Sequence, residues 1–294
     1  MNDDTRVPSR VFRRAEEDAQ SARHAGGGTP QTEDPSYRLA FQDLDFLLRE
    51  DLRPVRFQLE LLKPTLLLDE AGIDSLFVMY GSARIPEPSK AESLLELADT
   101  PESRRVAERL VEKSKYYDVA RELARLASGF PRDVNGKRHF VVCSGGGPSI
   151  MEAANRGAVD VGCDTVGLNI VLPHEQAPNP YVTPHLSFQF HYFALRKMHF
   201  LLRARAVAVF PGGFGTFDES FELLTLIQTG KIEPIPVIFY GKEFWNRVVN
   251  FEALCEEGVI SPRDLHLFHF CETAEEGWEI VRNFWRKRGE PELP

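Results

Sequence analysis

The sequence contains no long apolar run. Its longest runs, at residues 206–210 and 235–240, are far shorter than the roughly 18 to 20 apolar residues that a membrane-spanning helix needs. We therefore expect a chain without a membrane partner. The 294 residues are 43% hydrophobic and 27% charged, which is typical of a globular protein of one large domain or two small ones.

The sequence has fewer basic than acidic residues, and it has no closely spaced pair of cysteines. Lys and Arg total 35 against 44 Asp and Glu, and the net charge of -9 argues against a nucleic-acid partner. The cysteines at positions 143, 163, 255 and 271 include no CxxC pair and stand among apolar neighbours. This pattern indicates buried thiols rather than disulfides or a zinc site, and it favours a cytoplasmic protein.

The amino-terminal part differs in composition from the rest. Residues 1–35 are rich in charged residues, Ser and Gly and poor in large apolar residues, which predicts a flexible tail because burial cannot offset the entropy lost on ordering. Between Tyr37 and Leu68 apolar residues recur at helical spacing, with interruptions at Pro54 and Pro64. We predict a tail at 1–35, a helical extension at 36–72 and a main domain at 73–294.

Short apolar runs and helical stretches alternate through the main domain. The predicted strands are 75–80, 139–144, 165–171, 186–190, 206–210, 236–240 and 267–271, and the predicted helices are 102–127, 148–161, 192–203, 217–228, 242–257 and 274–288. Near-continuous apolar strands between helices predict an α/β fold, a doubly wound and mainly parallel sheet with helices on both faces. Such sheets bind ligands at the carboxyl ends of their strands, near the point where the strand order reverses.

Three glycine-bearing turns follow predicted strands. The first turn is YGSAR at 80–84, the second is SGGGPSIME at 144–152, and the third is PGGFGTFDE at 211–219. Each directs unpaired N–H groups and the positive end of a helix dipole toward the loop, an arrangement that binds phosphate. Neither GxxxxGK[ST] nor GxGxxG is present in register, so a mononucleotide fits better than a nucleoside triphosphate or a dinucleotide.

Each of these signals also has a purely structural interpretation. Glycines at such turns often only allow close packing. Thr216 and Glu219 fit a capping box, although a carboxylate beside a phosphate cradle could also orient water or polarise a ribose hydroxyl. Arg196 and Lys197 could form a solvated helix face or bind an anion.

The motifs together resemble a known family. The third turn matches the PGGxGTxxE motif of the Lonely Guy family of cytokinin-activating phosphoribohydrolases, many of whose bacterial members have been labelled lysine decarboxylases. Gly81-Ser82, the glycines of the second turn and Arg196-Lys197 occur in the family's order and approximate spacing, over about residues 75–240. The extension before residue 69 resembles that of the longer bacterial members.

This resemblance implies a Rossmann-like fold, a homodimer or higher homo-oligomer, and hydrolysis of a purine nucleoside 5'-monophosphate to free base and ribose 5-phosphate. It implies catalytic roles for Arg196 and Glu219 and no metal or cofactor. The implied substrate-binding residues are Gly81, Ser82, Gly145, Gly146, Gly147, Glu175, Lys197, Gly212, Gly213, Phe214, Gly215, Thr216 and Thr225. His174 or Asn179 could face the ligand in place of Glu175.

Two questions stay open on the sequence. The plant enzymes carry Met-His-x-Arg-Lys, whereas residues 193–195 here are Phe-Ala-Leu, so any contact that this His makes with the base is absent. The preferred base therefore stays open between adenine and an N6-substituted adenine. The alternative function is a non-catalytic nucleotide or molybdenum-cofactor carrier, in which Arg196 and Glu219 only shape the pocket. A pyridoxal-phosphate lysine decarboxylase is disfavoured, because no suitable His-Lys pair is present.

Overall fold

The computed structural model describes residues 12–24, 28–129, 135–173 and 177–289. Contacts divide the chain into two compact units, 1–59 and 60–294. The predicted division into three parts, with boundaries at 35 and 72, stays a prediction. No helix among the described residues is both long enough and apolar enough to cross a membrane.

The first unit is built of short helices. They are α1 (Ala15–His24), α2 (Pro30–Glu33), α3 (Leu44–Leu47) and short 3-10 helices at Pro35–Tyr37, Ala40–Gln42 and Glu50–Leu52. Helices α1 and α2 lie inside the segment that composition predicts to be flexible. Local capping accounts for the second of them, because the Thr29 side chain accepts the N–H of Thr32.

Helix α4 (Arg53–Glu70) runs through the predicted interruptions. Pro54 lies in its first turn, where the missing N–H has no intrahelical partner to lose. Pro64 lies inside the helix, and its ring is buried, so packing compensates for the lost hydrogen bond.

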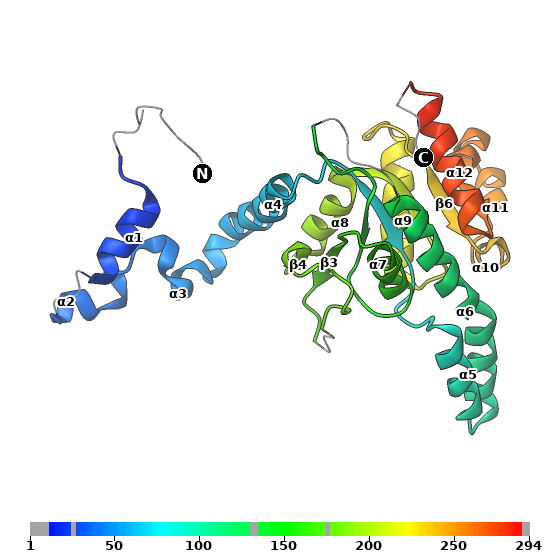
Figure 1. Ribbon diagram of the computed structural model, residues 1–294, viewed down its shortest axis with the longest axis horizontal. Coiled ribbons are helices and arrows are strands. Elements are labelled where there is room, and N and C mark those ends of the chain that lie inside the picture. Colours follow the sequence, from blue (N-terminus) through cyan, green and yellow to red (C-terminus); the bar gives the residue numbers. More distant parts are fainter. Residues whose placement is uncertain (1–11, 25–27, 130–134, 174–176, 290–294) are drawn as a thin grey trace. The chain divides into compact units, whose positions relative to one another are not determined.

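The second unit contains a seven-stranded parallel sheet of order β4-β3-β2-β1-β5-β6-β7 (Figure 1). Every pairing between neighbouring strands is parallel, so the predicted fold class is confirmed. The strands are β1 (Leu76–Tyr80), β2 (Val141–Ser144), β3 (Val166–Ile170), β4 (Ser187–Phe190), β5 (Ala204–Val209), β6 (Val237–Tyr240) and β7 (His269–Cys271). Each overlaps a predicted strand.

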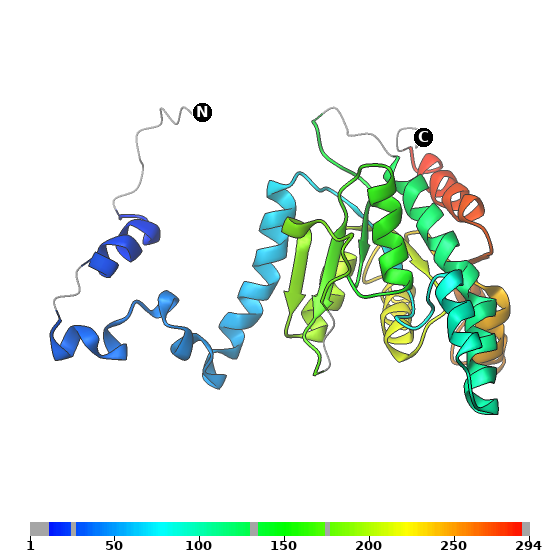
Figure 2. The same cartoon turned by 60° about the horizontal axis from the view of Figure 1, so that its bottom comes forward.

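Helices cover both faces of this sheet (Figure 2). The helices are α5 (Pro88–Glu96), α6 (Pro101–Ser128), α7 (Ile150–Asp160), α8 (Phe193–Leu202), α9 (Phe214–Gln228), α10 (Lys242–Val248), α11 (Phe251–Glu256) and α12 (Ala274–Arg286), with 3-10 helices at Pro184–Leu186 and Pro262–His266. Side chains of α6, α7 and α12 pack with Phe77 and Met79 of β1. Those of α8, α9, α10 and α11 pack with Leu76 and Val78, so alternate residues of one strand face opposite layers.

The helix predicted at 242–257 is interrupted. It divides into α10 and α11, because the side chain of Asn250 accepts the N–H of Ala253 and begins a new helix. This division lies far from the glycine turns along the chain.

The strand order reverses beside β1. The chain passes from β1 outward to β4 and then returns to pair β5 with the other edge of β1. The first and third glycine turns, which follow β1 and β5, therefore lie side by side at the carboxyl end of the sheet. Their backbones touch, because the N–H of Ser82 donates to the carbonyl oxygen of Pro211 at 3.2 Å.

Candidate functional site

Arg196 on α8 and Glu219 on α9 form a buried ion pair at the carboxyl end of the sheet. Nη1 of Arg196 lies 3.0 Å from Oε1 of Glu219, and the two side chains are only 10% and 12% exposed. Nε of Arg196 donates to the carbonyl oxygen of Leu168 in β3 at 2.7 Å, and the guanidinium lies 5.0 Å from the ring centre of Phe200. The pair therefore links β3 to the helix that follows β5.

Glu219 has an unusual acidity. Burial raises its pKa from the ordinary 4.5 to about 7, the positive charge of Arg196 opposes this shift, and the negative charge of Asp218 adds to it. Near neutral pH the carboxyl is therefore present in both protonation states. A group with this property is suited to accept or donate a proton during a reaction.

The third glycine turn leads directly into α9. The helix begins at Phe214, earlier than the predicted residue 217, and Gly213 is its N-cap. The capping-box interpretation of Thr216 and Glu219 is wrong, because Thr216 already lies inside the helix and the cap is made by no side chain. The N–H groups of the first turn have no intrahelical acceptor and stand at the positive end of the helix dipole.

The glycines of the third turn differ in their surroundings. A methyl group added to Gly212 would overlap the side chain of Thr216, whereas one added to Gly213 or Gly215 would meet no atom within 4 Å. Phe214 between them is 96% exposed. Space is therefore open beside the backbone at Gly213 and Gly215, at the start of α9, where an anion can approach a helix N-terminus.

The glycines of the first two turns lie against the protein's own side chains. Methyl groups at Gly81 and Gly147 would collide with Ile150 and Met151, and one at Gly145 would lie 2.6 Å from Nη2 of Arg196. Gly146 has a φ of +70° and lies against the Asn169 side chain. The absence of a side chain at Gly145 thus makes room for the Arg196 guanidinium, while direct contact of these turns with a ligand stays a prediction.

A buried polar network supports the second turn. Asn179 donates its backbone N–H to the Gly146 carbonyl at 2.8 Å and its side-chain amide to the Gly147 carbonyl at 2.9 Å. Its amide also donates to Oδ1 of Asn155, which accepts the Ser144 hydroxyl as well. Asn179 is 7% exposed and holds the turn in place through these bonds, while its contact with a ligand stays a prediction.

The other predicted site residues do not belong to the Arg196–Glu219 ion pair. Nζ of Lys197 lies 3.0 Å from Asp218 and 2.9 Å from Glu222, and these bonds raise its pKa despite the opposing effect of burial. Thr225 is exposed in the second half of α9, where its hydroxyl donates to the Phe221 carbonyl. Glu175 and His174 lie outside the described residues.

Two charged residues near the site have no motif that singles them out. Arg84 is exposed in the first glycine turn, and its N–H donates to the Ser82 hydroxyl at 3.0 Å. Glu60 contacts the start of α8 from a distant part of the sequence. Only the position of Arg84, in a turn after a central strand, offered a signal in the sequence.

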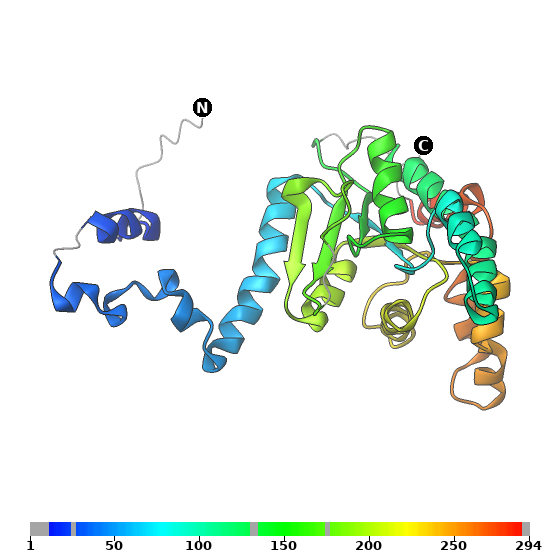
Figure 3. The ribbon, with the colours of Figure 1, turned by 90° about the horizontal axis from the view of Figure 1, so that it is seen from below.

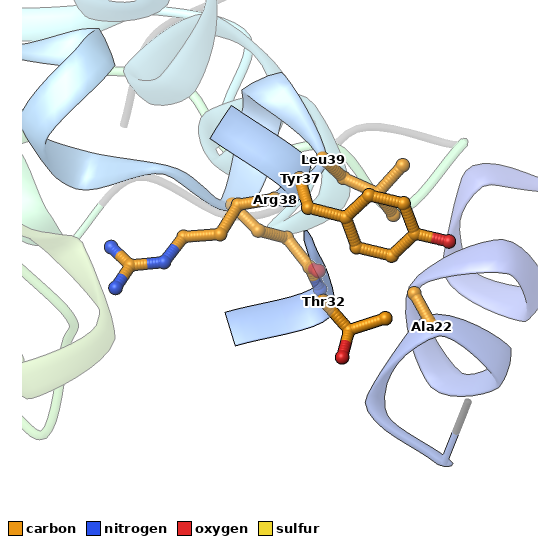
Figure 4. Close-up of a pocket in the computed structure, with 6 residues that line it drawn as sticks. Ala22, Thr32, Tyr37, Arg38 and Leu39 are labelled. Atoms are coloured by element: carbon orange, nitrogen blue, oxygen red, sulfur yellow. The ribbon is translucent and has the colours of Figure 1, made fainter. Parts of the chain in front are cut away.

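Two cavities are lined by residues other than this pair. Within the described ranges no group of three or more His, Cys, Asp or Glu residues is arranged to hold a metal ion, and the four cysteines are free thiols. A cavity of about 510 Å³ lies in the first unit, and Ala22, Tyr37 and Arg38 are among the residues that line it (Figure 4). A second cavity of about 290 Å³ lies at the amino end of β2, beside His139 and Cys163.

A family model described as possible lysine decarboxylase matches residues 151–281. Two curated relatives, both from Arabidopsis thaliana, are cytokinin riboside 5'-monophosphate phosphoribohydrolases. LOG1 is 34% identical over 28% of this chain and 38% of its own length, and LOG3 is 26% identical over 56% of this chain and 73% of its own length. The chain thus spans well under half the length of LOG1.

Two solved structures are similar in fold. One is the X-ray structure of TM1055, with a TM-score of 0.45 and 22% identity over 71% of this chain and 99% of that one. The other is the Moco carrier protein from Chlamydomonas reinhardtii, with a TM-score of 0.42 and 17% identity over 73% of this chain and 99% of that one.

The strand order and the helices on both faces define a doubly wound parallel α/β protein. Within this class, the resemblance to the Lonely Guy family that the motifs indicate is confirmed by the family model and by the two curated relatives. The matched region includes the Arg196-Lys197 pair and the third glycine turn.

Proposed function

We propose that the protein hydrolyses the N-glycosidic bond of a purine nucleoside 5'-monophosphate, releasing the free base and ribose 5-phosphate. One observation carries the proposal: a buried carboxyl of raised pKa, paired with an arginine, lies on the same helix whose open first turn can hold a phosphate. The likeness to LOG1 and LOG3 supports this reaction class.

The start of α9 anchors the substrate's 5'-phosphate. No side chain caps this helix and space is open beside Gly213 and Gly215, so phosphate oxygens accept the N–H groups of the first turn when the nucleotide binds. Glu219 lies between one and two turns farther along the same helix, so the sugar attached to that phosphate comes close to the carboxyl. Binding energy from this remote group then positions the reacting carbon, which predicts slow turnover of the unphosphorylated nucleoside.

Glu219 acts on the sugar and on the attacking water. As the bond between C1' and the base nitrogen breaks, its electron pair leaves with the base and positive charge develops on the sugar, which the ionised carboxylate stabilises. A water oxygen forms the new bond to C1' and passes one proton to Glu219, and the departing base nitrogen takes one proton from the solvent. Glu219 then returns its proton to the solvent and is ionised again. The reaction consumes one water molecule and needs no oxidant or reductant.

Arg196 favours the ionised state of Glu219 and fixes the position of its carboxylate. Its positive charge lowers the pKa of Glu219 against the effect of burial and so increases the ionised fraction at neutral pH. Its bond to the Leu168 carbonyl fixes the guanidinium to the sheet. In this scheme Arg196 organises the carboxylate and does not transfer a proton.

The proposal is tested by incubating the purified protein with AMP, isopentenyladenosine monophosphate and adenosine, and by measuring free base. We expect base from at least one monophosphate, much less from adenosine, and a rate at least about 100-fold lower from the E219Q variant. Comparison of the two monophosphates also decides whether the base is adenine or an N6-substituted adenine. Tight AMP binding without base release from any monophosphate would contradict the hydrolase and favour the carrier alternative.

We further propose a homodimer or higher homo-oligomer that acts in the cytoplasm, on the strength of the family resemblance and the free thiols. Light scattering of the purified protein measures the assembly. A mass of one chain at micromolar concentration would contradict it.

A further inference from the structure

Helix α8, which carries Arg196, has no cap of its own. Its N-cap residue is Tyr192, and no side chain of the α8 segment accepts a hydrogen bond there. The first N–H groups of a helix need such an acceptor when they are removed from water. The acceptor here comes from α4, in the extension that precedes the sheet.

The carboxylate of Glu60 on α4 accepts the N–H of the N-cap residue and the N–H of the residue before it. Its Oε1 accepts the N–H of His191 at 2.8 Å, and its Oε2 accepts the N–H of Tyr192 at 3.2 Å. The negative carboxylate also lies at the positive end of the α8 dipole. Of the two helices that carry the ion pair, α8 therefore has its N-terminus occupied by a carboxylate, whereas α9 has an open first turn.

Further contacts tie α8 to α4, which lies beside the edge strand β4 in Figure 3. Nε2 of His199 lies 3.1 Å from the Glu60 carbonyl oxygen, and the ring is 3% exposed. At the end of α8, Arg203 donates to Oδ1 of Asp69 at 2.7 Å and to the Thr65 carbonyl at 3.2 Å. The helix is thus held by residues 60–69 at its start and at its last turn.

The held turn leads directly to Arg196. The N–H of Arg196 donates to the carbonyl oxygen of Tyr192 at 3.1 Å, so the residue whose amide Glu60 binds also accepts the first helical bond of Arg196. The Arg196 side chain donates to the Leu168 carbonyl at 2.7 Å and to Glu219 at 3.0 Å. A shift of this turn therefore disturbs both hydrogen bonds. Catalysis is sensitive to displacements of this size.

We infer that Glu60 is a positioning residue, which holds α8 so that Arg196 reaches Glu219. Glu60 does not touch the substrate, and its effect passes through Tyr192 and Arg196. The inference rests on the proposed function for its effect on catalysis. The position of Arg196 can be measured without any substrate.

The experiment compares the full-length wild type with E60A, E60Q and the control E70A. Glu60→Ala removes both acceptors, Glu60→Gln keeps one, and Glu70 is an exposed acid on the same helix. Circular dichroism first establishes that each variant is folded. The first readout is the nuclear magnetic resonance signal and hydrogen exchange of the Arg196 Nε–H, which needs no activity.

We expect faster exchange of the Arg196 Nε–H in E60A, a smaller change in E60Q and none in E70A. In the hydrolysis assay we expect kcat of E60A to fall on the order of tenfold to a hundredfold with a smaller change in KM, because the phosphate anchor lies on α9. The pH midpoint of kcat/KM should also move upward, since a displaced Arg196 opposes the raised pKa of Glu219 less.

One outcome would overturn the inference, and another would defeat the proposed function alone. Unchanged Arg196 exchange in E60A, with His191 and Tyr192 amides exchanging faster, would overturn the positioning role and leave Glu60 as a simple helix cap. A wild type that releases no base would defeat the proposed hydrolase, while the Arg196 signal would still decide whether Glu60 holds that side chain.

Discussion

Nη1 of Arg196 lies 3.0 Å from Oε1 of Glu219, and neither side chain is more than 12% exposed. The two residues come from consecutive helices, α8 and α9, with β5 between them in the chain. Burial raises the pKa of Glu219 and the neighbouring guanidinium lowers it. The resulting pKa of about 7 depends on both residues, so either one can be used to alter it.

Replacement of the carboxyl should abolish chemistry while leaving binding nearly intact. For Glu219→Gln we expect kcat to fall about 100-fold to 10,000-fold, as is usual for loss of a general acid or base. KM for the monophosphate should change little, because the N–H groups at the start of α9 are unaltered. Steady-state measurement of base release gives both constants. Glu252→Gln, an exposed acid on α11, is the control, and equal kcat in E219Q and wild type would refute the role of Glu219.

Activity should depend on pH through Glu219. If the ionised carboxylate is the active form, kcat/KM rises as pH increases and reaches half its plateau near pH 7. Arg196→Met keeps an apolar stem but removes the charge that lowers this pKa, so the midpoint should move to higher pH and the rate at pH 7 should fall. A profile from pH 5 to 9 for both proteins measures the shift. An unmoved midpoint in R196M is incompatible with electrostatic coupling of the pair.

The stability contributed by Glu219 should fall as pH rises, whereas activity should increase. Because the folded-state pKa of Glu219 is raised, its contribution is fully present below about pH 4.5 and is lost as pH rises through about 7. Relative to E219Q, the wild type should lose on the order of 3 kcal/mol of unfolding free energy over that range. Urea unfolding of both proteins at pH 5 and pH 8 measures the difference, in which the titration of other groups cancels. A constant difference would show that burial does not perturb Glu219.

The sheet could be predicted because its strands carry a strong local signal. Residues 76–80 and 204–209 are almost wholly apolar, and a strand covered on both faces needs this composition. Helix boundaries were harder to place. Residues 213–216 include two glycines and an exposed Phe, so local propensity gave no indication that α9 begins at 214 rather than at 217.

The candidate site could be predicted in composition but not in geometry. The PGGFGTFDE motif locates Glu219, yet only the fold shows that Arg196 reaches it and that Gly145 leaves room for the guanidinium. The capping by Glu60 joins residues 131 positions apart in the sequence, and no local pattern indicates such a pair. The buried network around Asn179 is also invisible in the sequence, because its partners Gly147 and Asn155 lie more than 20 positions away.

Arg84 is expected to increase the preference for phosphorylated substrates. The other two cations of the site already contact carboxylates, Arg196 with Glu219 and Lys197 with Asp218 and Glu222. Arg84 is exposed in the turn whose Ser82 contacts Pro211 at the entrance to α9. For Arg84→Ala we expect KM for the monophosphate to rise about tenfold, the cost of one charged hydrogen bond, with little change for the nucleoside. Arg105→Ala on α6 is the control, and an equal loss on both substrates would exclude a phosphate contact.

Two neighbouring glycines should separate binding from folding. A methyl group at Gly215 meets no atom within 4 Å and stands in the first turn of α9, so Gly215→Ala should raise KM for the monophosphate while leaving stability equal or up to about 1 kcal/mol higher. A methyl group at Gly212 overlaps the buried Thr216, so Gly212→Ala should instead lower the unfolding free energy by about 1 to 3 kcal/mol. Urea unfolding and calorimetric titration with AMP measure the two effects. If G215A binds AMP as tightly as the wild type does, the phosphate does not lie at the start of α9.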